Sequence, residues 1–404
     1  MKSLKPTVTI CLYLLIVSLL VAGLPSRAYG ATATINLSQT NQTLRGFGGA
    51  SVWLGQLSDA NMDTLFGTGP GTIGLSIDRI RIAPDGNWND ELQNAKKAIA
   101  RGAIVMATPW TPPAAMKTNN NVVGGSLKAS EFANYANYLQ GFANFMSSNG
   151  APLYAIAIQN EPDIQVTYES CDWTAAQMLT FARSNAGAIS TRVIMCESFH
   201  FAKSYTDPIL NDAQARGNVD IIGGHIYGGG LADYPLARNN GKEVWMTEHL
   251  NTDTSITGII QTAKEMVDCM AIRNYYAYIW WFLKRFYGPI DDNGNRTKRG
   301  CVMAQFARWI RPGYVRVNAT YNPSANVFVC AFKSGSAVRI VAVNTGTSAV
   351  SQQFSITGGT VPSTFQRYRT SSTEDLATLG TIGTSGGSFT ASLPGQSITS
   401  FVSQ

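Results

Sequence analysis

Residues 45–312 alternate between two patterns of apolar and polar positions. Short apolar runs rich in β-branched residues are typical of strands buried on both faces of a sheet. Between these runs, apolar residues recur at the spacing of one helix face. The eight strand-like runs are Arg45–Ser51, Asp78–Ala83, Ala103–Trp110, Leu153–Glu161, Arg192–Ser198, Asp220–Tyr227, Glu243–His249 and Tyr275–Leu283. The main helix-like stretches are Asp90–Arg101, Ser130–Ser148, Ala175–Ser190, Ser255–Ile272 and Met303–Ile310.

This alternation predicts an α/β fold with parallel strands. Eight strand–helix repeats match the size of a (β/α)8 TIM barrel. A doubly wound open sheet is the alternative architecture. Polar and aromatic residues stand at the ends of many of the predicted strands. Side chains of this kind at so many strand ends favour the closed barrel, whose functional groups gather at one mouth.

The pattern changes after Pro312 and Gly313. From Tyr314 to Gln404 no helix period is evident, and short alternating runs are separated by Gly, Ser and Thr. This pattern predicts an all-β side sandwich of about 90 residues. The alternating runs are Val327–Phe332, Val338–Asn344, Gln352–Thr357, Thr364–Tyr368 and Ile398–Val402.

The chain therefore divides into four expected segments. Residues 1–30 form a signal peptide, 31–44 contain N-terminal strand residues, 45–312 form the barrel and 313–404 form the sandwich. The run Thr32–Leu37 alternates like the C-terminal strands, and we expect it to join their sandwich. No low-complexity linker separates the two units, so we expect them to form a rigid pair.

The N-terminus has the layout of an export signal. Lys2 and Lys5 precede the apolar stretch Val8–Leu24, and Ala28-Tyr29-Gly30 offers small residues for signal peptidase. We expect cleavage near Gly30 and a secreted, extracellular protein. A membrane anchor is the alternative, since the apolar stretch is of borderline length for a span. The small-residue exit and the polar residues that follow favour cleavage.

Composition and charge narrow the function classes. Hydrophobic residues make up 45% and charged residues 14% of the 404 positions, which favours a large core over disorder. The formal charge of +6 falls to +3 when the signal removes Lys2, Lys5 and Arg27. There is no concentrated basic stripe, so we expect no nucleic-acid partner. We expect a monomer with no membrane association after cleavage.

Cysteine and histidine give no support to a metal or redox centre. Cys11 leaves with the signal, and no CxxC pair occurs in the sequence. A bridge between Cys269 and Cys301 stays open, but buried free thiols are expected for most of these residues. The three histidines have no metal-ligand spacing. We therefore expect no cofactor and no metal. The five remaining cysteines are Cys171, Cys196, Cys269, Cys301 and Cys330.

Three predicted strands end in a glutamate. Glu161 ends the fourth, Glu197 the fifth and Glu248 the seventh. Strands four and seven face each other across a barrel mouth, so Glu161 and Glu248 can meet although they are far apart in the sequence. Two carboxyl groups about 5–5.5 Å apart are what retaining glycoside hydrolysis requires. The alternative for either residue is a structural ion pair, and we expect Glu197 to be a hydrogen-bonding wall residue.

Several motifs resemble a known glycosidase family. Asn160-Glu161-Pro162 and Glu248 are similar to the catalytic strand ends of the clan A retaining glycosidases. The segment TPWTPPAAMK at 108–117 resembles the SPWSPPxWMK motif of glycoside hydrolase family 30, and GFGGA at 46–50 resembles its opening strand. The segment IWWFLKRFYG at 279–288 is similar to the glucuronoxylanase branch. The resemblance extends from about Thr34 to the C-terminus and implies a barrel with a side β-sandwich.

The resemblance implies roles for the two acids and a substrate. Glu161 would be the general acid/base and Glu248 the nucleophile of a retaining endo-β-1,4-xylanase. Cleavage of glucuronoxylan would be directed by a 4-O-methylglucuronic acid side group. Arg285 would grip the uronate carboxylate with two parallel hydrogen bonds, and Tyr287 would contact the same group. The alternative for Arg285 is a surface position or a salt bridge to Asp291.

One loop departs from the branch pattern. The loop after the seventh strand, residues 249–255, has no Tyr and contains Asp253. In the branch this loop helps to hold the uronate with Tyr and Ser side chains. An inward-pointing Asp253 would repel a uronate. Activity on unsubstituted xylan therefore stays an alternative.

Aromatic side chains near the predicted strand ends are candidate walls for sugar rings. The resemblance adds that Asn160 would contact the 2-hydroxyl of the sugar and Tyr227 would hydrogen-bond the nucleophile. It also implies that Arg81 would keep the nucleophile ionised. The core is an equal alternative for Trp53. The candidate walls are Trp53, Trp110, Tyr168, Tyr227 and Trp281.

Two other functions compete with xylan hydrolysis. A family 30 enzyme could act on a β-glucan or a glucosyl lipid, against which the Arg285–Tyr287 segment argues. A non-catalytic carbohydrate-binding protein would not need both Glu161 and Glu248.

Overall fold

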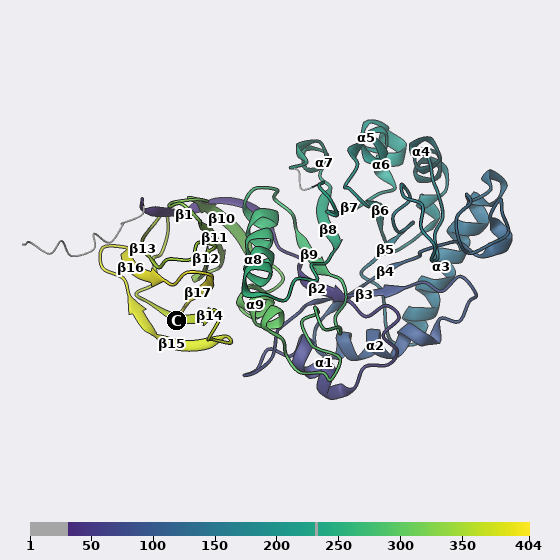
Figure 1. The fold of residues 1–404 in the computed structure, drawn as a ribbon. Coiled ribbons are helices and arrows are strands. Elements are labelled where there is room, and N and C mark those ends of the chain that lie inside the picture. Colours follow the sequence, from purple (N-terminus) through teal and green to yellow (C-terminus); the bar gives the residue numbers. More distant parts are fainter. Residues whose placement is uncertain (1–30, 231–232) are drawn as a thin grey trace, which may run out of the picture.

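The computed structural model describes residues 31–230 and 233–404, so the signal peptide predicted for residues 1–30 lies outside the described residues. Eight parallel strands close into a barrel in sequence order, with β9 paired to β2. The predicted TIM barrel is confirmed (Figure 1). Its strands are β2 (Gly46–Ala50), β3 (Ile77–Arg81), β4 (Ile104–Thr108), β5 (Ala155–Ala157), β6 (Arg192–Ser198), β7 (Ile221–His225), β8 (Glu243–His249) and β9 (Ala277–Trp280).

Helices surround the barrel and follow most of its strands. The predicted long helices are present, but α9 begins at Lys298, well before the expected Met303, because Thr297 caps its first turn. The sequence analysis did not mark α1 or the short helices α5 to α7. The helices are α1 (Asp59–Phe66), α2 (Asn89–Ala100), α3 (Phe132–Ser148), α4 (Ala175–Ser184), α5 (Lys203–Asn211), α6 (Ala213–Gly217), α7 (Pro235–Asn239), α8 (Ile256–Ala271) and α9 (Lys298–Ala307).

The barrel interior is packed with apolar side chains on the side opposite the site. Ile77, Met106, Ile194 and Trp245 from four different strands belong to one fully buried cluster. Strand β2 can lie close to its neighbour because it is rich in glycine: a Cβ on Gly48 would meet the Ile77 carbonyl oxygen at 2.3 Å. This apolar cluster therefore fills one end of the barrel and fixes the strands relative to one another. The polar groups lie at the other end, at the carboxyl ends of the strands.

The C-terminal unit is a nine-stranded sheet that includes the N-terminal strand. Strand β1 pairs antiparallel with β10 and parallel with β13. The two layers of the predicted sandwich belong to one continuous sheet, and Phe354, Phe389 and Phe401 contact one another between them. The strands are β1 (Ala33–Thr43), β10 (Val315–Ala319), β11 (Val327–Ser334), β12 (Ala337–Asn344), β13 (Val350–Thr357), β14 (Thr364–Thr370), β15 (Ala377–Gly383), β16 (Ser388–Leu393) and β17 (Ser397–Ser403).

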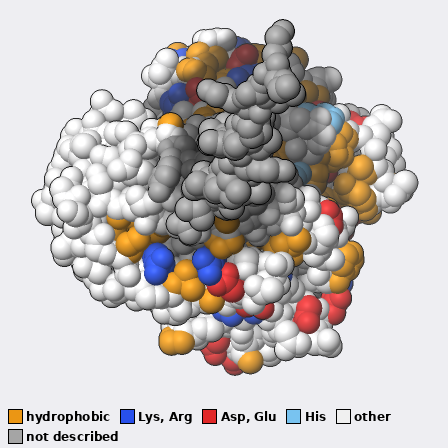
Figure 2. Space-filling model, turned by 60° about the vertical axis from the view of Figure 1, so that its left-hand side comes forward, with side chains coloured by type: hydrophobic (Ala, Val, Ile, Leu, Met, Phe, Trp, Pro, Cys, Tyr) orange, Lys and Arg blue, Asp and Glu red, His pale blue; other side chains and the backbone are white. Residues whose placement is uncertain are grey.

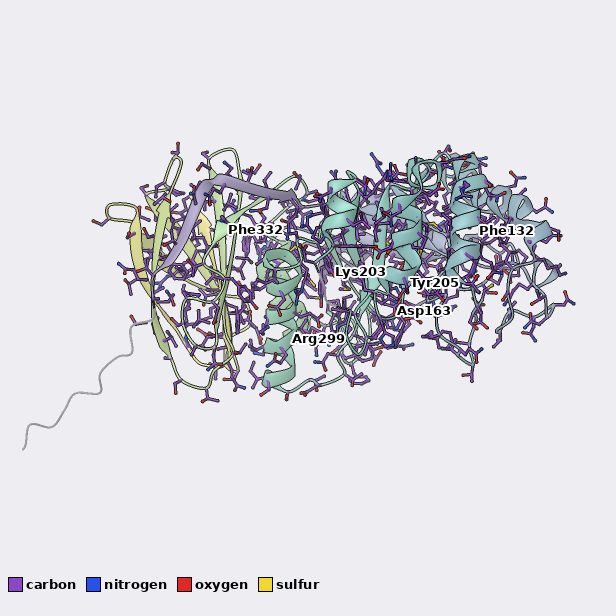
Figure 3. All side chains as sticks on the ribbon, turned by 90° about the horizontal axis from the view of Figure 1, so that it is seen from above. Phe132, Asp163, Lys203, Tyr205, Arg299 and Phe332 are labelled. Carbon is purple, nitrogen blue, oxygen red and sulfur yellow. The ribbon has the colours of Figure 1, made fainter. Side chains whose placement is uncertain are left out.

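Helices α8 and α9 join the sheet to the barrel, and Figure 3 shows Arg299 on α9 at this junction. The Arg299 side chain is buried, donates to the Asp253 carbonyl oxygen at 2.6 Å and lies 4.7 Å from the Trp280 ring. From the sheet side, the Ser400 hydroxyl donates to the Gln305 carbonyl oxygen at 2.7 Å. The Arg299 contacts fix α9 within the barrel, and the buried Ser400–Gln305 hydrogen bond crosses the junction and helps to hold the two units in one orientation.

The low share of charged residues and the absence of paired cysteines can both be followed in the described part of the structure. Among the described atoms in Figure 2, the backbone and side chains drawn in white predominate, and the Lys, Arg, Asp and Glu side chains form no large patch of one sign. All five cysteines among the described residues are buried and free, so Cys269 and Cys301 are not bridged. No helix within the described ranges has the length and apolar character needed to cross a bilayer.

Candidate active site

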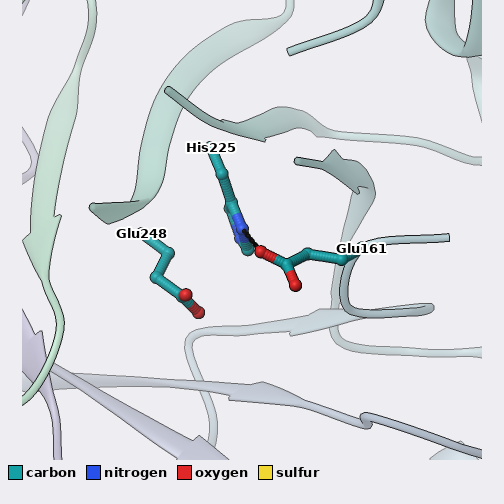
Figure 4. A group of neighbouring side chains, drawn as sticks. All are labelled: Glu161, His225 and Glu248. Atoms are coloured by element: carbon teal, nitrogen blue, oxygen red, sulfur yellow. Dashed lines mark hydrogen bonds and ion pairs between the residues drawn. The ribbon is translucent and has the colours of Figure 1, made fainter. Parts of the chain in front are cut away.

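Glu161 and Glu248 meet at the carboxyl ends of the barrel strands (Figure 4). Glu161 follows β5, and Glu248 is the sixth residue of β8. One oxygen of each carboxylate and a ring nitrogen of His225 all lie within 4.8 Å of one another. Both glutamates are only about one-twentieth exposed, at 5% and 6%. The carboxylates therefore face each other across a small, largely dehydrated space.

The backbone around the site adopts conformations that side chains rarely accept. Trp53, Glu161 and Glu197 have φ values of 56°, 44° and 49°, in the left-handed region. Such a conformation is costly for a residue with a Cβ and is typical of functional sites, where the surrounding structure enforces it. The surrounding fold therefore holds these three residues in a strained backbone conformation and so fixes the positions of their side chains.

Arg79 lies beneath Glu248 and orders the floor of the site. Its guanidinium is completely buried, forms an ion pair with Glu248 and donates to Asn160 Oδ1 at 2.7 Å. Burial lowers the pKa of Arg79, but the carboxylates of Glu197 and Glu248 outweigh burial, and the pKa is raised. Arg79 therefore stays charged and stabilises the ionised form of Glu248.

The structure contradicts the role expected for Arg81. Arg81 makes a two-pronged ion pair with Glu169 and lies 5.6 Å from the Trp53 ring, and it has no contact with Glu248. Alternate residues of a strand point to the same face. Arg81 is the last residue of β3 and reaches over the rim, whereas Arg79 lies two residues deeper in the barrel. The support for Glu248 thus comes from Arg79, which the sequence analysis missed.

A tyrosine holds the second oxygen of Glu248. The Tyr227 hydroxyl donates to Glu248 Oε1 at 2.8 Å, while Arg79 binds Oε2. Burial and the neighbouring Glu248 carboxylate raise the pKa of Tyr227 well above its usual value. The phenol thus remains a hydrogen-bond donor. With donors on both oxygens, Glu248 has a fixed orientation.

Glu161 has different partners. His225 Nδ1 lies 2.9 Å from Glu161 Oε1, and the Tyr168 hydroxyl donates to Oε2 at 3.2 Å. His225 is fully buried, which lowers its pKa, but Glu248, Glu161 and Glu197 together raise that pKa to about 9. A proton is therefore held between Glu161 and His225 at neutral pH. The two glutamates therefore have different charged partners: the Arg79 guanidinium pairs with Glu248, and the protonated His225 imidazole pairs with Glu161.

Glu197 supports the site from below. It is fully buried, lies 3.3 Å from the Arg79 guanidinium and accepts a hydrogen bond of 2.9 Å from the Thr108 hydroxyl. Burial raises the pKa of Glu197, but Arg79 and His225 outweigh it, and the pKa is lowered. Glu197 is thus a charged partner of Arg79 and His225, and it does not line the open cavity.

A cavity of about 410 Å³ opens above the two glutamates. The structure brings all five predicted aromatic walls to this cavity. Three apolar members of the lining, Phe199, Leu250 and Phe282, were not predicted from the sequence. The sequence signal for Phe199 is its place directly after the strand that carries Glu197, and its ring stacks on Tyr227 with centroids 4.9 Å apart. The lining residues are Trp53, Trp110, Glu161, Tyr168, Phe199, Tyr227, Glu248, Leu250, Trp281 and Phe282.

Asn160 precedes Glu161 in the segment that follows β5 and is buried next to the cavity lining. Its Oδ1 is occupied by Arg79, and its Nδ2 has no hydrogen bond to any described residue. An amide nitrogen left free next to a carboxylate pair can donate to a substrate hydroxyl.

Arg285 and Tyr287 stand at the rim rather than in the cavity lining. The exposed Arg285 guanidinium lies 5.3 Å from the ring of Phe282, which is itself part of the lining. Arg285 forms no ion pair with a described residue, and the Asp291 carboxylate instead accepts the amides of Asn293 and Asn295. The guanidinium is thus free to bind an anion. Tyr287 is half-buried next to it.

Asp253 is turned toward the helix that follows it. Its carboxylate accepts the Ser255 amide at 2.8 Å and lies against Gly258 in the first turn of α8. Hydrogen bonding to Ser255 lowers the pKa of Asp253. A carboxylate at a helix N-terminus is favourably placed in the helix dipole. Asp253 is not part of the cavity lining, so it does not place negative charge above the glutamates.

Glu161, His225 and Glu248 also have the composition of a metal site. Their donor atoms are engaged, however: Arg79 and Tyr227 bind Glu248, and His225 and Tyr168 bind Glu161. The charge that a cation would supply is already provided by Arg79 and the protonated His225.

Comparison with known proteins connects this geometry to one family. The family described as "Glycosyl hydrolase family 30 TIM-barrel domain" matches residues 85–256. The chain is 41% identical to the glucuronoxylanase XynC of Bacillus subtilis strain 168 over 386 residues, which cover 91% of each chain.

Two solved structures are similar over nearly the whole fold. A glycoside hydrolase family 30 subfamily 8 xylanase of Clostridium acetobutylicum has 46% identity and a TM-score of 0.89, covering 92% of this chain and 99% of that one. A family 30 endoxylanase of Clostridium papyrosolvens C71 has 43% identity and a TM-score of 0.86, with coverages of 93% and 100%.

Proposed function

The chain belongs to glycosyl hydrolase family 30, and we propose that it is a retaining endo-β-1,4-xylanase that cuts glucuronoxylan at positions set by a glucuronic acid side group. The observation that carries this proposal is the separation of at most 4.8 Å between oxygens of Glu161 and Glu248. Carboxyl groups this close leave no room for a water between acid and base, as inversion would need.

In the first step Glu161 donates the proton that it shares with His225 to the glycosidic oxygen, while a Glu248 oxygen attacks the anomeric carbon. The glycosidic bond breaks, the leaving chain departs with the proton, and a covalent glycosyl–enzyme ester forms. In the second step Glu161 removes a proton from water. The hydroxide left by that transfer attacks the anomeric carbon, the ester bond breaks and Glu248 leaves as a carboxylate; the proton from water remains on the Glu161–His225 pair.

The surrounding residues match these two roles. Tyr227 and Arg79 bind the two oxygens of Glu248 and fix its orientation, as an attacking group requires. His225 keeps a proton next to Glu161, which alternates between acid and base. The free Nδ2 of Asn160 is placed to donate to the sugar 2-hydroxyl, a contact that strengthens in the transition state.

The rim supplies the proposed substrate preference. The unpaired, exposed Arg285 guanidinium can bind the uronate carboxylate with two parallel hydrogen bonds, and Tyr287 lies beside it. Because Asp253 is bound to the first turn of α8, it does not oppose that anion. The relatives named as a glucuronoxylanase, a xylanase and an endoxylanase support the same substrate class. The protein would be secreted after loss of residues 1–30 and act as a monomer.

Product mapping on a defined glucuronoxylan tests this function. We expect each product to carry its uronate at one constant distance from the new reducing end, and no release of sugar from β-1,6-glucan. Products with random uronate positions would contradict side-group direction, and cleavage of the glucan would favour a different substrate. Glu248→Gln should bind xylan without turnover, whereas Glu131→Gln, a control at a half-buried residue outside both cavities, should match the parent enzyme.

A further inference from the structure

We propose that a second cavity, separated from the catalytic cavity by Trp53, binds an additional neutral sugar unit of the substrate main chain. The proposal rests on the proposed function and adds a binding site to it. The cavity has a volume of about 440 Å³ and lies between the loop after β2 and the first turns of α2. Its lining residues are Trp53, Gly55, Gln56, Arg81, Asn89, Asp90, Glu91 and Gln93.

Trp53 connects the two cavities because it lines both of them. Its side chain is 43% exposed, yet it is held in place by the Trp110 ring at 5.0 Å and the Arg81 guanidinium at 5.6 Å. The left-handed backbone of Trp53 shows that the fold enforces this position. A fixed, part-exposed indole that lines both cavities can contact a sugar ring in each of them. A chain leaving the catalytic cavity therefore passes Trp53 into the second one.

The second cavity presents many hydrogen-bonding groups. The amides of Gln56, Asn89 and Gln93 are exposed, and none of them hydrogen-bonds to a described residue. Glu91 is only 5% exposed, and its Oε2 has no hydrogen-bond partner among the described residues. Free amides around an aromatic wall, with a buried unpaired carboxyl oxygen, match the hydroxyl groups of a pyranose.

Charge selects a neutral sugar for this cavity. Its cation, Arg81, is already neutralised by the two-pronged pair with Glu169. Burial and the nearby Asp78 raise the pKa of Glu91 to about 8, so this carboxyl is protonated at neutral pH and can donate a hydrogen bond. Asp90 would repel a uronate. The uronate therefore belongs to Arg285 at the rim, and the second cavity takes an unsubstituted xylose unit.

The test uses xylo-oligosaccharides that carry one glucuronic acid and differ only in the length of the main chain. The double variant Asn89→Ala/Gln93→Ala removes two amides without breaking a hydrogen bond to any described residue. We expect kcat/KM on the longest substrates to fall about fivefold to tenfold, with no change on the shortest substrates that are cleaved. Gln93→Trp should fill the cavity and give the same dependence of kcat/KM on chain length. The control Lys96→Ala, on the exposed side of α2, should leave kcat/KM unchanged on both long and short substrates.

A loss of kcat/KM that is equal at every chain length, or no loss at all, would overturn the proposal that the second cavity binds a sugar unit. Melting temperatures of all variants distinguish these outcomes from unfolding. If the parent enzyme cleaves none of the substrates, the proposed function itself is wrong and the second cavity falls with it.

Discussion

His225 Nδ1 lies 2.9 Å from Glu161 Oε1, and the His225 Nε2 atom faces Glu197 at 3.8 Å. The imidazole thus bridges the proposed acid/base to a fully buried carboxylate that is also paired with Arg79. This arrangement gives Glu161 a protonated imidazole as its partner, whereas Glu248 is paired with a guanidinium. It also makes the proton on His225 part of the catalytic apparatus.

The first prediction concerns pH. Because the pKa of His225 is about 9, the Glu161–His225 pair retains its shared proton at neutral pH and loses it as the pH rises through about 9. We expect kcat/KM to decline on the alkaline side near that pH. His225→Gln should lower kcat by about tenfold to a hundredfold and shift the alkaline decline. A pH profile of kcat/KM checks this, and an unchanged alkaline limb in the variant would contradict it.

The second prediction separates two arginines of one strand. Arg79→Lys should lower kcat by about 100-fold or more, because a lysine cannot bind Glu248, Asn160 and Glu197 together. Arg79→Met should also destabilise the fold by about 3–5 kcal/mol, since it leaves buried carboxylates unpaired. Arg81→Lys is the matched control and should keep kcat within about twofold on short substrates. Steady-state kinetics and thermal melting measure both; equal effects of Arg79→Lys and Arg81→Lys on kcat would refute the assignment.

The third prediction concerns the rim cation. Arg285→Ala should lower kcat/KM on glucuronoxylan by about tenfold to a hundredfold, because one charge-assisted, two-pronged contact is lost. Activity on linear xylan should change little. The neighbouring Lys284→Ala serves as control for a general loss of positive charge. Equal losses on both xylans would remove the uronate role from Arg285.

The fourth prediction concerns two buried acids outside the catalytic pair. Burial raises the pKa of Asp78 to about 7 and that of Glu91 to about 8. The folded state therefore binds more protons than the unfolded state between about pH 4 and these values, and stability falls as the pH rises through this window. Asp78→Asn should flatten the decline in the free energy of unfolding. Denaturant unfolding at pH 5 and pH 8 tests this, and an identical decline in the variant would count against it.

Much of this site could be predicted from the sequence because strand ends define a barrel mouth. Glu161, Glu248 and the aromatic walls follow from that rule together with the family motifs. The role of supporting Glu248 was assigned to Arg81 and belongs to Arg79. Both arginines point to the same face of β3, and the sequence does not show that Arg79 lies deeper in the barrel. Phe199, Leu250 and Phe282 were missed because loop conformation, not strand periodicity, brings them to the cavity. The second cavity depends on how the β2 loop lies against α2, which no local pattern indicates.

The most direct test of the central claim is the anomeric configuration of the first product, followed by proton NMR during early hydrolysis of xylan. Oxygens of Glu161 and Glu248 within 4.8 Å require a double displacement. The β-anomer of the new reducing end should therefore appear first and convert to the α-anomer only by mutarotation. Initial release of the α-anomer would contradict the account.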